Sequence, residues 1–128
     1  MDKYKAQLVA KGYTQEHGVV ILRFFSPVAR LDTIRVVISL AALKEWTIYQ
    51  LDVKSAFLHG ELSEEVFVEQ PPGYEQKGNE QKVYRLKKAL YGLKQAPRAW
   101  YSRIESYFMK EGFKKCHYEH TLFIKTGK

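Results

Sequence analysis

Residues 47–58 give the clearest strand pattern in the chain, and apolar and polar residues alternate over residues 49–54. β-branched, aromatic and aliphatic residues dominate it, as is typical of strands. Successive strand side chains point to opposite faces, so Asp52 lies opposite Leu51 and Val53. We expect the apolar face to pack on a helix layer. The carboxylate of Asp52 is then held on an open face near the end of the strand.

Shorter segments show the same period of two. Residues 3–14 have a basic face opposite a largely apolar face. Residues 66–70 and 82–88 are predicted to pair as a hairpin, and Pro71-Pro72-Gly73 ends its first strand. Residues 19–25 are apolar without a clear period and support no structural prediction. The further predicted strands are residues 3–14, the hairpin strands 66–70 and 82–88, and residues 121–124.

Two segments have the period of a helix. The first begins at Asp32 or Thr33, ends near Trp46 and is apolar on almost every side, so we expect it to be mostly buried. The second covers residues 98–111, with Gly112 placed to end it. Helices and strands are intermixed, which predicts an α+β fold in a single domain over residues 1–128.

Composition narrows the functional classes. The chain has 45% hydrophobic and 14% aromatic residues, which argues for a folded protein. Its net charge of +7 suggests a polyanionic partner, for which nucleic acid is the first candidate and an anionic membrane surface the second. No apolar run is long enough to span a bilayer. We expect nucleic acid and not a membrane as the partner. The single cysteine fits a reducing compartment, and we expect an intracellular location in the cytoplasm or nucleus.

Candidate metal ligands are few. An acidic residue fixed at a strand end suits a hard cation such as Mg²⁺, although an exposed strand carboxylate without a role is the competing interpretation of Asp52. Cys116, His117 and His120 lie close in sequence, but strand neighbours point to opposite faces and no second Cys or His pair exists. We therefore do not expect a zinc site.

Two long strings go beyond these patterns: residues 49–58 (YQLDVKSAFL) and residues 83–100 (VYRLKKALYGLKQAPRAW). In this order they closely resemble the reverse transcriptase of copia-type retrotransposons. The resemblance extends over nearly the whole chain, from Lys5 to Thr121. It implies a partial right-hand polymerase fold, comprising the fingers and upper palm, with mixed strands and packed helices.

The resemblance also implies roles for individual residues. Asp52 matches the first catalytic aspartate, which binds both Mg²⁺ ions of a two-metal nucleotidyl transfer. Phe57 matches the aromatic gate that selects deoxynucleotides. The segment 91–97 matches the loop that contacts the incoming nucleotide, and its implied nucleotide-binding residues are Tyr91, Gly92, Lys94, Gln95 and Pro97.

Basic residues are the implied phosphate contacts. Lys5 and Lys11 stand where the fingers of the family offer cations to phosphates. The basic face of the predicted hairpin adds Arg85, Lys87 and Lys88, for which a merely solvated face is the alternative.

The chain departs from the family in three places. The family has a Tyr-x-Asp-Asp turn after a strand matching residues 122–124, and this chain ends at Lys128 before it. We therefore expect no primer extension by the isolated chain. Gln7 stands where the family usually has Arg, and the apolar residues 20–24 replace a polar, acidic stretch, which suggests a compensated frameshift.

The implied function is a fragment of an RNA-directed DNA polymerase. Its partners in the complete enzyme are an RNA or DNA template–primer, deoxynucleoside triphosphates and the remaining palm, thumb and RNase H of the polyprotein. Two alternatives remain: a basic nucleic-acid-binding module without catalysis, and a degenerate relic of a retroelement without function.

Overall fold

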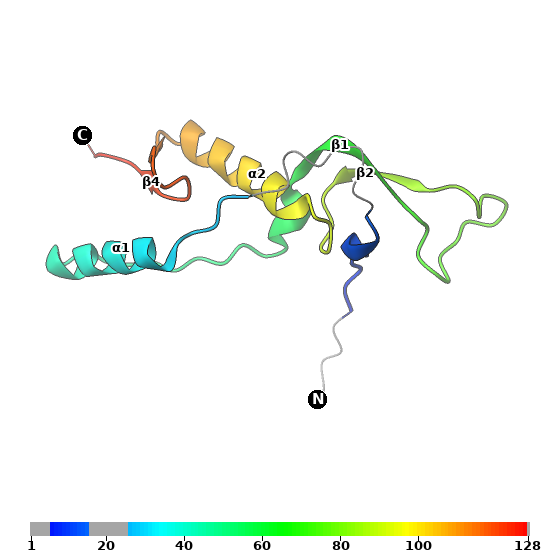
Figure 1. Ribbon diagram of the computed structural model, residues 1–128, viewed down its shortest axis with the longest axis horizontal. Coiled ribbons are helices and arrows are strands. Elements are labelled where there is room, and N and C mark those ends of the chain that lie inside the picture. The colour runs from blue at the N-terminus through cyan, green and yellow to red at the C-terminus, as the bar shows by residue number, and fades with distance from the viewer. Residues whose placement is uncertain (1–5, 16–25, 128) are drawn as a thin grey trace, which may run out of the picture. The chain divides into compact units, whose positions relative to one another are not determined.

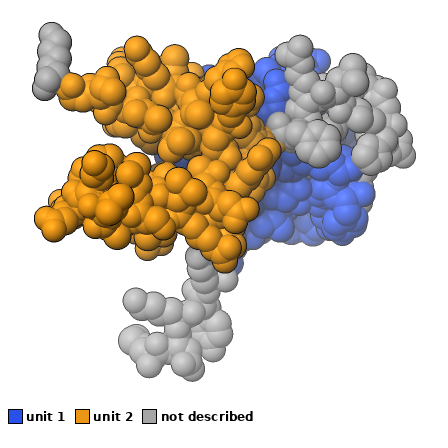
Figure 2. Space-filling view, turned by 60° about the vertical axis from the view of Figure 1, so that its left-hand side comes forward, with its two compact units in different colours: residues 1–25, 55–103 blue, residues 26–54, 104–128 orange. Residues whose placement is uncertain are grey.

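The structure, a computed structural model, describes residues 6–15 and 26–127 (Figure 1). These residues fall into two compact units (Figure 2). Unit 1 takes its described residues from Met1–Phe25 and Ser55–Arg103, and unit 2 from Ser26–Lys54 and Ile104–Lys128. The elements in chain order are η1 (Gly12–Thr14), α1 (Leu31–Leu43), η3 (Ala56–His59), β1 (Glu61–Val68), β2 (Tyr84–Lys88), α2 (Ala96–Lys110), β3 (Lys114–Lys115) and β4 (Phe123–Ile124).

The central feature of unit 1 is the antiparallel pair of β1 and β2, which confirms the predicted hairpin. Val66 pairs with Leu86, and Glu61 pairs with Lys88. Between these two pairs β1 advances by five residues and β2 by two, so β1 carries a bulge. The connection between the strands, residues 69–83, extends away from them (Figure 1).

Small residues let the elements of unit 1 approach closely. Its buried core contains Val66, Leu93 and three alanines, Ala89, Ala96 and Ala99. A Cβ at Gly60 would lie 2.8 Å from the backbone carbonyl carbon of Ala99, so only glycine lets the start of β1 approach the first turns of α2. This packing fixes the start of α2 beside the hairpin.

Both long helices end in a Schellman motif. At the end of α2, the N–H of Phe113 donates to the carbonyl of Phe108 (2.9 Å), and Gly112 has φ +82°. The predicted terminating role of Gly112 is confirmed. At the end of α1, the N–H of Trp46 donates to the carbonyl of Ala41 (2.8 Å), and Glu45 takes the left-handed position with φ +54°.

Aromatic packing organises the C-terminal part of unit 2. The ring of Phe108 stacks on Phe123 with centroids 4.9 Å apart, and it meets Phe113 edge-on at 5.1 Å. β3 and β4 pair antiparallel through Lys115 and Phe123. The predicted strand over 121–124 is therefore present in shortened form.

Three predictions about secondary structure and burial are wrong. Residues 46–53 form no strand, because no described segment forms the hydrogen bonds of a β-sheet with their backbone. The side chains are not buried either, since Leu51 is 89% exposed. Residues 6–11 likewise form no strand, and the rest of the predicted strand, residues 3–5, lies outside the described residues. α1 is not mostly buried: of its residues only Ala41 is.

The fold class is confirmed only in its coarse form, a small mixed α/β chain with two helices and short sheets. The predicted helices agree with α1 and α2 within a few residues at each end. The polymerase arrangement and the single domain over residues 1–128 stay predictions.

Candidate functional site

The loop between β2 and α2 carries most of the predicted nucleotide-binding residues. Its Tyr91 packs against Phe57 of η3, with ring centroids 4.9 Å apart and planes tilted by 49°. Ser55, with φ +56°, turns the chain into η3. Phe57 and Tyr91, 34 positions apart in the sequence, are thus brought into contact, each half-buried.

A short N-terminal segment, Ala10–Gln15, lies directly on this loop. The N–H of Ala10 donates to the carbonyl of Tyr91 (2.7 Å). Gly92 has φ +91°, and a Cβ there would lie 2.0 Å from the carbonyl oxygen of Ala10. A Cβ at Gly12 would lie 1.8 Å from the carbonyl oxygen of Gly92. Both glycines are therefore required for this approach of two backbones.

Gln15 fixes the next part of the loop. Its Oε1 accepts the backbone N–H of Lys94 (3.1 Å), and its Nε2 donates to Oε1 of Gln95 (3.2 Å). The ammonium of Lys94 donates to the backbone carbonyl of Gln15 (2.9 Å). Gln95 is buried, so its predicted contact with a nucleotide would require it to leave this arrangement.

The loop passes directly into α2. Pro97 is the second residue of the helix and is exposed, in the first turn where a missing N–H leaves no intrahelical bond unmade. Arg98 follows, and its guanidinium pairs with Glu64 on the bulge of β1 (3.2 Å). This half-buried pair links the start of α2 to the strand that follows η3.

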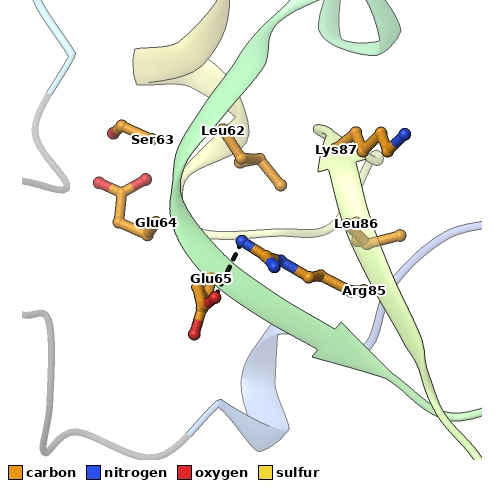
Figure 3. A pocket seen from close by; sticks show the side chains of 7 residues that line it. All are labelled: Leu62, Ser63, Glu64, Glu65, Arg85, Leu86 and Lys87. Carbon is orange, nitrogen blue, oxygen red and sulfur yellow. Dashed lines mark ion pairs between the residues drawn. The ribbon is translucent and has the colours of Figure 1, made fainter.

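The predicted phosphate contacts on β2 lie beside a hollow of about 440 Å³ at the bulge (Figure 3). Arg85 reaches from β2 to Glu65 on β1 and pairs with it at 2.8 Å. Any phosphate contact of Arg85 would compete with this pair. Lys87 and Lys88 are exposed on the same strand. Lys11 is an exposed residue of the Ala10–Gln15 segment, and Lys5 lies outside the described residues.

Asp52 belongs to unit 2 and lies in the irregular segment before η3, with its side chain exposed to solvent. An exposed carboxylate fits one position in the coordination of Mg²⁺, an ion that keeps several waters and takes one or two protein carboxylates. The residues that the structure describes contain no group of three His, Cys, Asp or Glu side chains placed to hold a metal. Asp52 as metal ligand and catalytic residue stays a prediction.

Some residues of the site were missed by the sequence patterns. Gln15 and Ala10 carry no local signal for a contact with a loop about 80 residues away. Gly12 and Gly92 do carry a local signal, since a glycine can mark a close approach of two backbones. The glycine does not indicate which segment approaches it. Glu64 likewise carries no sequence signal for its ion pair with Arg98.

Known proteins resemble the chain over most of its length. A retrovirus-related Pol polyprotein from transposon RE2 of Arabidopsis thaliana is 47% identical over 97% of the chain and 8% of that protein. The corresponding protein of transposon TNT 1-94 from Nicotiana tabacum is 45% identical over 96% of the chain and 9% of its own length. A truncated transposon Ty1-A Gag-Pol polyprotein of Saccharomyces cerevisiae is 36% identical over 84% of the chain.

The chain thus spans less than a tenth of the length of these relatives. No solved structure matches it. None of the helices that the structure describes has the length and apolar character needed to cross a bilayer. The reverse transcriptase (RNA-dependent DNA polymerase) family matches residues 1–128, and the chain belongs to that family.

Proposed function

We propose that the chain is the fingers and upper palm segment of a retrotransposon reverse transcriptase and supplies part of its nucleotide site. The observation that carries the proposal is the family match over all 128 residues. The curated relatives are Pol polyproteins of transposons, of which the chain covers a small segment. The remaining palm, the thumb and RNase H would come from the rest of such a polyprotein.

In this function Asp52 is the first metal-binding carboxylate. Two Mg²⁺ ions supply the chemistry of nucleotidyl transfer, because they lower the pKa of the primer hydroxyl and offset the charge of the triphosphate. Asp52 would hold them together with carboxylates from the rest of the polyprotein. The exposure of its side chain supports the assignment, since a carboxylate must be accessible to a hydrated ion and a substrate phosphate.

Phe57 and the loop after β2 would form the nucleotide pocket. The contact between Phe57 and Tyr91 holds the phenyl ring in one place, as a gate against a 2′-hydroxyl requires. Lys94 offers a half-buried cation to the triphosphate. Template and primer phosphates would meet the exposed Lys87 and Lys88.

The experiment is a segment exchange. Residues 1–128 replace the matching segment of the TNT 1-94 polyprotein, and primer extension on RNA is measured with Mg²⁺. We expect extension, and D52N to slow it about a thousandfold, because a catalytic metal contributes several kcal/mol of charge stabilisation. D32N is the matched control, since Asp32 is exposed and its ion pair among the described residues is with Arg35 at 3.6 Å.

Each outcome bears on the proposal. If D52N extends primers as fast as the unaltered chimera, the role of Asp52 is wrong. If the chimera is inactive while the unaltered TNT 1-94 protein is active, the chain is a degenerate segment. Primer extension by the isolated 128-residue chain would contradict the need for the rest of the polyprotein.

A nucleic-acid-binding module without catalysis is the second candidate, and the net charge of +7 favours it. Binding to duplex DNA at several salt concentrations tests it, because each phosphate contact adds about −0.9 to the log–log slope. We expect K87Q/K88Q to make this slope less negative, by the contribution of about two phosphate contacts. The control is K44Q/K77Q, which removes two exposed lysines that are not part of β2. Equal slopes for both double variants would exclude this contact surface.

A further inference from the structure

Gln15 makes three hydrogen bonds to two consecutive residues of the loop after β2. Its side-chain amide accepts from the N–H of Lys94 and donates to the side chain of Gln95, while its backbone carbonyl accepts from the ammonium of Lys94. The partners lie 79 and 80 positions away in the sequence. One half-buried side chain thus fixes the loop backbone and a buried amide, and the backbone carbonyl of the same residue holds the cation.

We propose that Gln15 is the positioning residue of the nucleotide loop, holding Lys94 where a triphosphate can meet its ammonium. The inference rests on the proposed function, because it assigns a purpose to the geometry of the same loop. Gln15 itself touches no substrate in this proposal. It acts through Lys94 and Gln95.

The charge of Lys94 supports the proposal. Among the described residues, none of the ion pairs includes Lys94, and its ammonium rests on a neutral carbonyl. A carbonyl orients a cation without neutralising it, so the positive charge stays available for an anion. Without this hydrogen bond, the flexible lysine side chain would lose its conformational freedom at the moment the substrate binds. Holding the side chain in advance lowers that ordering cost, which strengthens binding.

The rest of the interface suggests that the loop folds without Gln15. Ala10 bonds to Tyr91, and the backbones at Gly12 and Gly92 pack together independently of the Gln15 side chain. Substitution of the Gln15 side chain should therefore free the backbone N–H of Lys94 and the amide of Gln95, while the Ala10–Tyr91 contact and the Gln15 carbonyl remain. The effect on catalysis should appear in the binding of the nucleotide more than in the chemical step.

The first test is amide hydrogen exchange of the 128-residue chain, read by NMR at Lys94 and Ala10. Q15L should raise the exchange rate at Lys94 about fivefold or more, the size expected for one lost hydrogen bond, and leave Ala10 unchanged. Q15E keeps an acceptor for the Lys94 N–H and should preserve its protection. Q81L is the matched control, since Gln81 is exposed on the β1–β2 connection.

The second test uses the active chimera. Q15L should raise the KM for a deoxynucleoside triphosphate about tenfold and leave kcat within about twofold, because uniform binding is lost while the chemical step is retained. Q81L should change neither constant. A loss of kcat without a change in KM would overturn the positioning role.

The two proposals fail separately. Unchanged exchange at Lys94 in Q15L, or lost protection in Q15E as well as Q15L, overturns the role of Gln15 whatever the chain catalyses. Full activity of D52N overturns the proposed function and leaves the exchange result intact. Rapid exchange at Ala10 in Q15L would show that Gln15 holds the whole segment, and that also contradicts the proposal.

Discussion

At the scale of single residues, Gly92 makes the contact of the loop with Ala10 possible. G92A should destabilise unit 1 by about 2 kcal/mol or more, because a non-glycine residue is strained at φ +91° and its methyl carbon would meet the Ala10 carbonyl at 2.0 Å. Urea unfolding measures the loss. G73A is the control, since Gly73 has φ +82° with nothing within 4 Å of the added carbon. Equal losses in both variants would show that the contact with Ala10 contributes nothing.

Glu119 shows how a residue contributes a pH-dependent term to the stability of unit 2. The hydroxyl and N–H of Thr121 donate to its carboxylate, and together with Thr33 and Arg30 they hold the pKa of Glu119 below its ordinary value of 4.5. A carboxylate whose pKa is lower in the folded state than in the unfolded state stabilises the fold at pH values above its unfolded-state pKa. This stability is lost as the pH falls through the folded-state pKa.

The prediction concerns Thr121, the largest cause of that lowered pKa. T121V should raise the pKa of Glu119 toward 4.5, because the hydroxyl donor is removed. NMR titration of the carboxyl carbon measures it, and less stability should then be lost as the pH falls below the ordinary pKa of 4.5. T47V is the control, because Thr47 is exposed in the same unit. An unchanged pKa in T121V would mean that the hydroxyl does not act on the carboxylate.

Sequence patterns reveal such residues only in part. Gly92 can be recognised as a special backbone position, because glycine takes φ values that other residues avoid. Its partner Ala10 cannot, since nothing in an alanine marks a close approach. Gln15 has the same difficulty: an amide on the chain gives no sign of which distant N–H it will accept. The implied site residues come from long matching strings, and the contacts that hold them come from three-dimensional packing.

At the scale of elements, the end of α1 carries a residue that strains its motif. Glu45 occupies the left-handed position of the Schellman motif with φ +54°, where glycine is preferred. E45G should stabilise the chain by about 0.5–1 kcal/mol, because relief of the strain outweighs the added freedom of the unfolded chain. E45A is the control, since it removes the carboxylate and keeps the Cβ. Equal urea midpoints for E45G and E45A would contradict the argument.

The elements that were predicted correctly have local signals. Pro71-Pro72-Gly73 follows β1 closely, and Pro97 and Gly112 mark the two ends of α2. The segment 46–53 has an equally clear alternation and forms no strand. Alternation says which face a strand would bury, but a strand also needs a hydrogen-bonded neighbour. That neighbour is not encoded in the segment itself.

At the scale of the whole molecule, the sequence predicts more burial than the described residues show. The largest differences are in unit 2, where Val36 and Ile38 of α1 are 66% and 49% exposed. Trp46, Tyr49 and Leu51 are exposed as well. An apolar helix indicates burial only if something packs on it, and the composition of the helix does not name that partner. The coarse α/β class was predictable because it depends only on which elements occur.

These exposed apolar residues predict self-association of the purified chain at micromolar concentrations, since large exposed apolar patches mark association surfaces. V36K/L51K should reduce the mean mass in sedimentation velocity and leave the free energy of unfolding within about 0.5 kcal/mol, because both side chains are exposed. S39K/Q50K adds the same charge on exposed polar positions of the same unit. If both variants reduce the mass equally, charge repulsion drives the change, and if neither does, the apolar surface of unit 2 does not mediate association.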